Sequence, residues 1–371
     1  MTSLDVSLVT PVPSTLVAGT LPAKTSFTMV ADLIYDTPDQ INCKVYECII
    51  TAIRQPNVKE FRPTAEEREG NKYVIKVRTP RPNANLQNTP LDYAMDSLSS
   101  LKSFWQMRQR FDNSAFPQPP GQYKAKLEDC LMRGDLCALV EIRTNDPNQP
   151  THGVMMPWDG VSLEEVMKKR ARGDGGDKAL PLGEIFHQED GKGKFTEEEV
   201  LKIAHSLRVA VTPFHRTGYT HCDIKPGNIL VRQDASGTTH YVLIDDERTK
   251  FAAKRSEIST IQIPIDVKPP ANCVPRLDYI YMLSTCIQLL RGRVEKLRKK
   301  KDVLDRLEHV KNKDLKALLT QWARWLEPIE ENKEAKEEIK VEPALQQDME
   351  DTVAKTRMAM GNVFAEMFKK K

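Results

Sequence analysis

The sequence predicts an α+β protein with a small β-rich N-terminal lobe and a larger α-helical C-terminal lobe. Between Phe27 and Trp158, β-branched and aromatic runs such as FTMVADLIY and KYVIKV are separated by turn-rich segments, which is typical of consecutive strands. After Trp158 the apolar spacing becomes helical. A chain of 371 residues with 40% apolar residues is long enough to bury the core of such a fold.

The strand and helix patterns alternate in a definite order along the chain. About five strands are expected, in FTMVADLIY, NCKVYECIITAI, KYVIKV, LCALVEIR and HGVMMPW. Helices are expected in LDYAMDSLSSLKSFWQMRQRF, QYKAKLEDCLMRG and SLEEVMKKRAR, and then at 277–291, 293–308 and 314–326. A further helix, FTEEEVLKIAHSLRVAVTPFHRTG, opens on a capping box formed by Thr196 and Glu199 and closes at Gly218.

Composition changes mark the expected domain boundaries. Residues 1–26 are rich in Ser, Thr and Pro and are expected to form a mobile arm. The β-rich lobe is expected at 27–157, with a proline-bounded insertion at 79–120, and the α-rich lobe at 158–326. A charged linker and an amphipathic C-terminal helix fill 327–371.

Charge and cysteine content exclude some classes of partner. Lys and Arg total 55 against 52 acidic residues, a net charge of +3, so we expect no nucleic-acid partner and no membrane association. The seven cysteines are scattered without a CxxC pair, which favours a reducing compartment. We expect a cytoplasmic protein. The basic run RVEKLRKKK (293–301) is typical of a solvated helix face or, alternatively, of a nuclear-import signal.

The stretch HCDIKPGNILV (221–231) carries the residues most typical of chemistry. Asp223 and Asn228 present a carboxylate and an amide oxygen five residues apart, and Asp245 follows the apolar strand YVLI. Hard oxygen ligands of this kind suit Mg²⁺, which also binds substrate phosphates. Lys76, in the strand YVIKV, is the candidate cation for those phosphates. The set predicts phosphoryl transfer.

From about Phe27 to about Leu326, the chain resembles a protein kinase. HCDIKPGNIL is similar to the family's H-R-D-L-K-x-x-N loop, VLID to its metal-binding strand, and YVIKV to its V-A-I-K strand. The resemblance implies a bilobal kinase-like fold that uses ATP and Mg²⁺ to phosphorylate Ser or Thr hydroxyls of a protein.

The resemblance also implies a role for each matching residue. Asp223 would be the catalytic base and Lys225 a contact to the transferred phosphate, with Asn228 and Asp245 as metal ligands. Asp278, in RLDYIYML, would be the buried acid that braces the loop. The nucleotide contacts would be Lys76, its partner Glu128, Val45, and Met155 and Met156 in the segment similar to the family's hinge.

Several positions depart from the family pattern. The positions of the glycine-rich loop hold Pro38, Gln40 and Cys43, which predicts weaker nucleotide binding because side chains hinder close backbone approach to phosphates. Asp-Phe-Gly is replaced by Asp245, Asp246 and Glu247.

Two alternatives therefore stay open. One is a pseudokinase that keeps the fold as a scaffold, and the other is a small-molecule kinase of the aminoglycoside or choline type, whose Ile-Asp strand end is similar to this one. The C-terminal stripe from Leu345 is expected to pack back onto the α-rich lobe or to bind a partner protein.

Overall fold

The computed structural model describes most of the chain and divides it into two compact units. The described ranges are 2–13, 20–37, 41–56, 60–65, 72–80, 89–107, 125–143, 151–157, 160–172, 194–234, 236–244, 275–292, 300–326 and 343–368. The first unit spans Met1–Met107, Arg133–Asp159 and Met349–Lys371, and the second spans Arg108–Met132 and Gly160–Asp348. Each unit is described by itself below.

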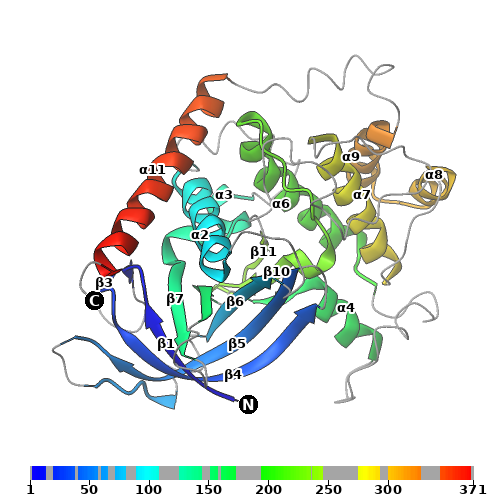
Figure 1. The fold of residues 1–371 in the computed structure, drawn as a ribbon. Helices are drawn as coiled ribbons and strands as arrows, with labels where there is room; N and C mark the ends of the chain where they lie inside the picture. The colour runs from blue at the N-terminus through cyan, green and yellow to red at the C-terminus, as the bar shows by residue number, and fades with distance from the viewer. Residues whose placement is uncertain are drawn as a thin grey trace. The chain divides into compact units, whose positions relative to one another are not determined.

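Six antiparallel strands of the first unit close into a barrel in the order β1-β4-β5-β6-β8-β7 (Figure 1). The strands are β1 (Thr2–Leu8), β4 (Ser26–Thr37), β5 (Ile41–Arg54), β6 (Lys72–Pro80), β7 (Ala138–Arg143) and β8 (Thr151–Pro157). A two-stranded hairpin, β2 (Val12–Pro13) and β3 (Thr20–Leu21), follows β1. Five of the barrel strands are those predicted from the sequence.

The sixth strand, β1, closes the barrel and corrects the prediction of a mobile N-terminal arm. β1 pairs with β4 from Thr2↔Ala31 to Ser7↔Ser26, and with β7 from Asp5↔Arg143 to Leu8↔Val140. Leu4, Val6 and Leu8 recur at every second residue, and the last two are buried. The prediction is wrong here because a high Ser and Thr content does not by itself indicate disorder, whereas the period of two in the apolar residues indicates a strand.

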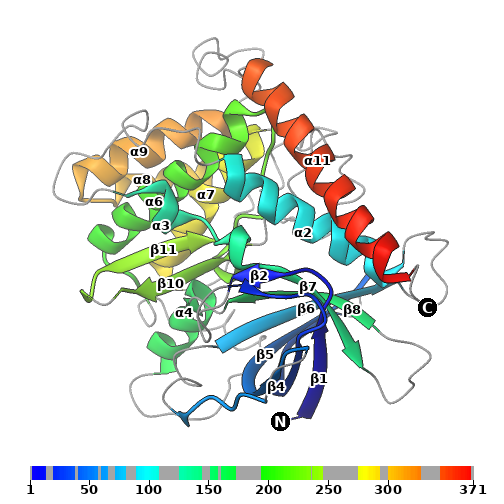
Figure 2. The same ribbon diagram turned by 90° about the vertical axis from the view of Figure 1, so that its left-hand side faces the viewer.

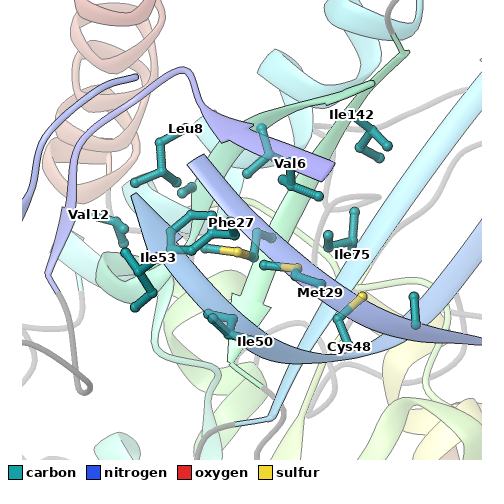
Figure 3. Close-up of a cluster of buried hydrophobic side chains, with 14 of the residues drawn as sticks. Val6, Leu8, Val12, Phe27, Met29, Cys48, Ile50, Ile53, Ile75 and Ile142 are labelled. Carbon is teal, nitrogen blue, oxygen red and sulfur yellow. The ribbon is translucent and has the colours of Figure 1, made fainter. Parts of the chain in front are cut away.

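The barrel interior is a continuous apolar core. Side chains from β1, β4, β5, β6 and β7 converge in Figure 3, among them Val6, Phe27, Met29, Ile50 and Ile75. Because successive side chains of a strand point to opposite faces, Ile75 and Val77 point into this core and their neighbours on β6 point out. The barrel register therefore decides which residues face outward.

Helix α2 (Pro90–Met107) covers the outer face of β6, β7 and β8. It lies in the predicted insertion, at the place where the sequence predicts a helix. Its buried residues Ala94, Leu98, Leu101 and Trp105 recur at helical spacing. The short 3₁₀ helix η3 (Gly134–Leu136) packs against it so closely that a Cβ at Gly134 would lie 2.1 Å from the Leu101 carbonyl oxygen.

The C-terminal helix α11 (Pro343–Phe368) lies beside α2 in both views (Figures 1 and 2). Met349 is fully buried, and Ser99 and Ser103 of α2 make hydrogen bonds to residues of α11. The sequence predicts this helix. In the barrel unit, its hydrogen bonds are made with α2. The expectation that it packs on the α-rich lobe was therefore wrong for Met349–Phe368.

The second unit is mainly helical. Its helices are α3 (Leu127–Cys130), α4 (Leu163–Arg172), α6 (Glu197–Arg216), α7 (Pro275–Arg291), α8 (Lys300–Glu308) and α9 (Lys313–Ala323), with 3₁₀ helices η4 (Pro226–Asn228) and η7 (Arg324–Leu326). A small sheet of β9 (Val161–Ser162), β10 (Ile229–Gln233) and β11 (Thr239–Leu243) has the order β11-β10-β9. No helix among the described residues is long and apolar enough to cross a membrane.

Helix α6 begins at the predicted capping box. Thr196 accepts a hydrogen bond from the Glu199 backbone N–H at 3.2 Å, and the Glu199 carboxylate accepts one from the Thr196 N–H at 2.8 Å. The same carboxylate binds Arg170 of α4, with Nη2 to Oε1 at 2.6 Å. This arginine, followed by the Thr196 N–H and hydroxyl, lowers the pKa of Glu199 to about 2.

We predict that Leu8→Ala lowers the free energy of unfolding by about 2–5 kcal/mol, because it leaves a cavity in a closed core. Ser3→Ala, at an exposed position of the same strand, should change it by less than about 0.5 kcal/mol. Urea denaturation of the full chain measures both. Equal, negligible effects would mean that β1 contributes nothing to the barrel.

We also predict that Glu199 makes stability depend on acidity. Its folded pKa lies below the ordinary value of 4.5, so its contribution is present above pH 4.5 and is lost as the pH falls toward about 2. Glu199→Gln should therefore be less stable than the wild type at pH 6, and the difference should shrink at pH 3. Glu198→Gln, whose side chain is exposed, is the control.

Candidate active site

The stretch 219–228 forms a loop between helix α6 and strand β10. The helix ends at Arg216, the Thr217 hydroxyl donates to the Pro213 and Phe214 carbonyls, and Gly218 turns the chain with φ at 81°. At the other end, Pro226 opens the 3₁₀ turn η4, which leads directly into Ile229 of β10. Both ends of the loop are therefore anchored by regular structure.

A buried carboxylate, Asp278 of α7, organises the first half of this loop. Its Oδ1 accepts a hydrogen bond from the Cys222 N–H at 2.7 Å, and its Oδ2 accepts one from the His221 N–H at 2.9 Å. The His215 ring lies 2.9 Å from the same Oδ2. The side chain of Asp278 is fully buried. These bonds confirm the prediction that Asp278 braces the loop, whereas the contribution of His215 was not predicted.

The ring of His221 ties the loop to the end of strand β11. Its Nδ1 accepts from the Asp223 N–H at 3.3 Å, and its Nε2 lies 3.0 Å from the Ile244 carbonyl oxygen. An acceptor at Nδ1 and a carbonyl at Nε2 together place the ring hydrogen on Nε2. The Ile244 N–H donates in turn to the Asn228 carbonyl at 2.9 Å. Ile244, the residue before Asp245, is thus held at both backbone groups.

The polar groups at the centre of the loop converge on Asp223. Lys225 Nζ lies 2.9 Å from its Oδ2, and Asn228 Nδ2 lies 3.1 Å from the same oxygen and 2.8 Å from the Asp223 carbonyl. Asp223 is 4% exposed, whereas the Lys225 side chain is 43% exposed. A nearly buried carboxylate thus has a solvent-accessible cation and an amide beside it.

Cys222 takes a backbone conformation that is uncommon for a residue with a side chain, with φ at 63°. The N–H groups of His221 and Cys222 both donate to one carboxylate, and the chain turns directly after them. The sulfur of Cys222 is disulfide-bonded.

In the barrel unit, Lys76 of β6 lies on the outer face of the sheet. Its Cα partners are Val45 on β5 and Val154 on β8. Met156 pairs with Val74 and shares this outward face. Met155 pairs with Ile75 and belongs to the barrel core. Of the predicted nucleotide contacts in this unit, Val45 and Met156 thus share the face of Lys76, whereas Met155 points away from it.

Of the remaining predicted site residues, the structure describes some and leaves others outside the described ranges. Glu128 lies on α3 in the second unit and is exposed, so its pairing with Lys76 stays a prediction. Asp245, Pro38 and Gln40 lie outside the described residues. Within the described ranges, no three His, Cys, Asp or Glu side chains gather as a metal site. Asn228 directs its amide nitrogen to Asp223, so its oxygen is the atom suited to a hard cation.

No family model matches the chain, and no curated protein matches it. Among solved structures, the PknI kinase domain of Mycobacterium tuberculosis is similar in three crystal structures of mutants. One double mutant has 17% identity and a TM-score of 0.32, and covers 81% of this chain and 94% of its own. Another double mutant has 16% identity and a TM-score of 0.33, and covers 89% of this chain and 95% of its own. A single mutant has 16% identity and a TM-score of 0.31, and covers 81% of this chain and 94% of its own.

We predict that Asp278→Ala lowers the free energy of unfolding by about 3 kcal/mol or more, because it leaves two backbone N–H groups buried without an acceptor. Asp278→Asn, which retains one carbonyl oxygen, should cost less. Asp305→Ala, at an exposed position of α8, is the control. Chemical denaturation measures all three. A loss no larger than that of the control would show that the loop does not depend on this carboxylate.

Proposed function

We propose that this protein is an ATP-dependent phosphotransferase of the protein-kinase type that phosphorylates Ser or Thr hydroxyls of a protein. The observation that carries the proposal is the cluster of Asp223, Lys225 and Asn228 on a loop fixed by Asp278. The sequence resemblance assigned roles to these residues, and their contacts are compatible with those roles.

Each group in the cluster has a defined part in the proposed reaction. The Asp223 carboxylate would accept the proton of the attacking hydroxyl, and its low exposure keeps competing water away. Lys225 lies within 2.9 Å of that carboxylate, so its ammonium would reach the phosphoryl group in transfer. The Asn228 amide nitrogen donates one hydrogen bond to the Asp223 carboxylate and one to the Asp223 backbone carbonyl, and so holds that residue in place. These residues position and neutralise charge, as phosphoryl transfer requires.

The oxygen donors of the loop fit a magnesium ion. Asn228 Oδ1 would hold the ion together with Asp245, which follows the anchored Ile244 in the sequence. Bound Mg²⁺ supplies neutralisation of charge on the phosphate oxygens. Lys76 would hold the other phosphates of ATP, and its outward position between Val45 and Val154 is compatible with this role.

A scaffold that has lost catalysis is the second candidate, because the Asp278 network would stabilise the loop in either case. The exposure of Lys225 beside the buried Asp223 favours an enzyme. A carboxylate that is 4% exposed is costly to bury, and a purely structural role would not require its cation to be 43% exposed. A small-molecule kinase is the third candidate, and it differs only in where the phosphate goes.

We predict that Asp223→Asn reduces phosphate transfer by about 10²–10⁴-fold and leaves ATP binding nearly unchanged, because the variant loses a base and no phosphate contact. Transfer is measured with γ-labelled ATP and a mixture of protein substrates. Label on protein supports the proposal, and label only on a small molecule supports the third candidate. Full activity of Asp223→Asn would contradict the assignment of the base.

We further predict that Lys76→Met weakens ATP binding and transfer together. Lys72→Met is the matched control, because Lys72 lies on the same face of β6 and pairs with Glu47 at 2.9 Å. Titration calorimetry with ATP and Mg²⁺ measures binding by each variant. Equal losses in both variants would show that the effect belongs to the strand and not to Lys76.

A further inference from the structure

Helix α2 is buried on two separate faces. Its apolar face, with Leu98, Leu101 and Trp105, packs against the barrel and η3. Ser99 and Ser103, one helical turn apart, lie on a second face and are at most 1% exposed. In both views of the fold, α11 runs along α2 (Figures 1 and 2). One helix therefore connects the strand that carries Lys76 to the C-terminal helix.

Two hydroxyl hydrogen bonds connect α2 to α11. The Ser99 hydroxyl donates to the Val353 carbonyl at 3.5 Å, and the Ser103 hydroxyl donates to Thr356 Oγ1 at 3.4 Å. Met349 is fully buried and lies one turn before Val353 on the same face of α11. Long hydroxyl bonds of this kind exchange with water at little net cost, and serine side chains bury little apolar area. The hydrogen-bonded contact between α2 and α11 can thus form and separate more easily than the closed barrel core can open.

The apolar face of α2 packs against the strands that form the proposed nucleotide site. α2 contacts β6 and β8, the strands that carry Lys76 and its partner Val154. Val154 and Leu139, which pair across β7 and β8 on this outward side, are both 1% exposed, so this side is covered. A shift of α2 would uncover apolar side chains in the same cross-strand row as Lys76.

We propose that α11 is an intrachain brace: its docking holds α2 against β6 and β8, so that α11 docking and ATP binding at Lys76 favour each other. The nucleotide half of this inference rests on the proposed function. Because coupling between two sites is reciprocal, undocking of α11 weakens ATP binding by the same factor by which ATP strengthens docking. The brace gives the chain a built-in control element that a partner competing for α11 would release.

Met349→Ser tests the brace in the full chain, because it removes a buried apolar side chain from α11 without changing any residue of α2. Met358→Ser is the matched control: the same substitution on the same helix at a side chain that is 69% exposed. Ser103→Leu is a second variant that separates the helices from the α2 side. Hydrogen exchange is followed in 90–107, in 343–368 and in β5, and ATP affinity is measured by calorimetry.

The brace predicts that Met349→Ser and Ser103→Leu speed exchange in both helices, leave β5 unchanged, and weaken ATP binding about fivefold or more. Met358→Ser should behave as the wild type. Faster exchange confined to 343–368, or unchanged ATP affinity in a chain whose wild type binds ATP, would overturn the inference. A wild type that binds no ATP would overturn the proposed function and the coupling, and exchange in 90–107 would still decide whether α11 holds α2.

Discussion

The buried carboxylate of Asp278 is the interaction on which the candidate site depends. It accepts two consecutive backbone N–H groups, which is compatible with the left-handed conformation of Cys222, and it also contacts the ring of His215. The next residue in the chain is Asp223, so the direction of its side chain follows from this anchoring. Removal of a partner from a fully buried charge is costly, and the chain around Asp278 therefore has little freedom. The loop geometry is a consequence of one acid on a neighbouring helix.

The barrel unit obeys a different constraint, the alternation of side chains along its strands. Closure by β1 requires one face of every strand to be apolar, and this assigns Ile75 and Met155 to the core. Lys76 must then face outward, in a row with Val45 and Val154. A slip of one residue in β6 would place the lysine in the core. The core that holds the barrel together thus also determines where the proposed phosphate-binding cation can lie.

Much of this arrangement could be predicted from the sequence. Period-two and helical patterns located five barrel strands and the helices, and Thr196 with Glu199 marked the start of α6. The spacing of Asp223, Lys225 and Asn228 predicted their convergence. Other features depend on pairing between distant segments: β1 gains its stability from β4 and β7, and α11 from α2. Met155 was misplaced because a motif locates a segment, whereas only the strand register shows which side chain points inward.

We propose that the loop 221–228 handles phosphate in catalysis and is not only a preserved shape. The most direct measurement is the melting temperature of the full chain with millimolar ATP, in the presence and absence of Mg²⁺, because a ligand that binds the folded state must raise it. We predict a rise with ATP that is larger when Mg²⁺ is present and that is reduced in Asn228→Ala. The absence of any shift with ATP and Mg²⁺ would contradict it.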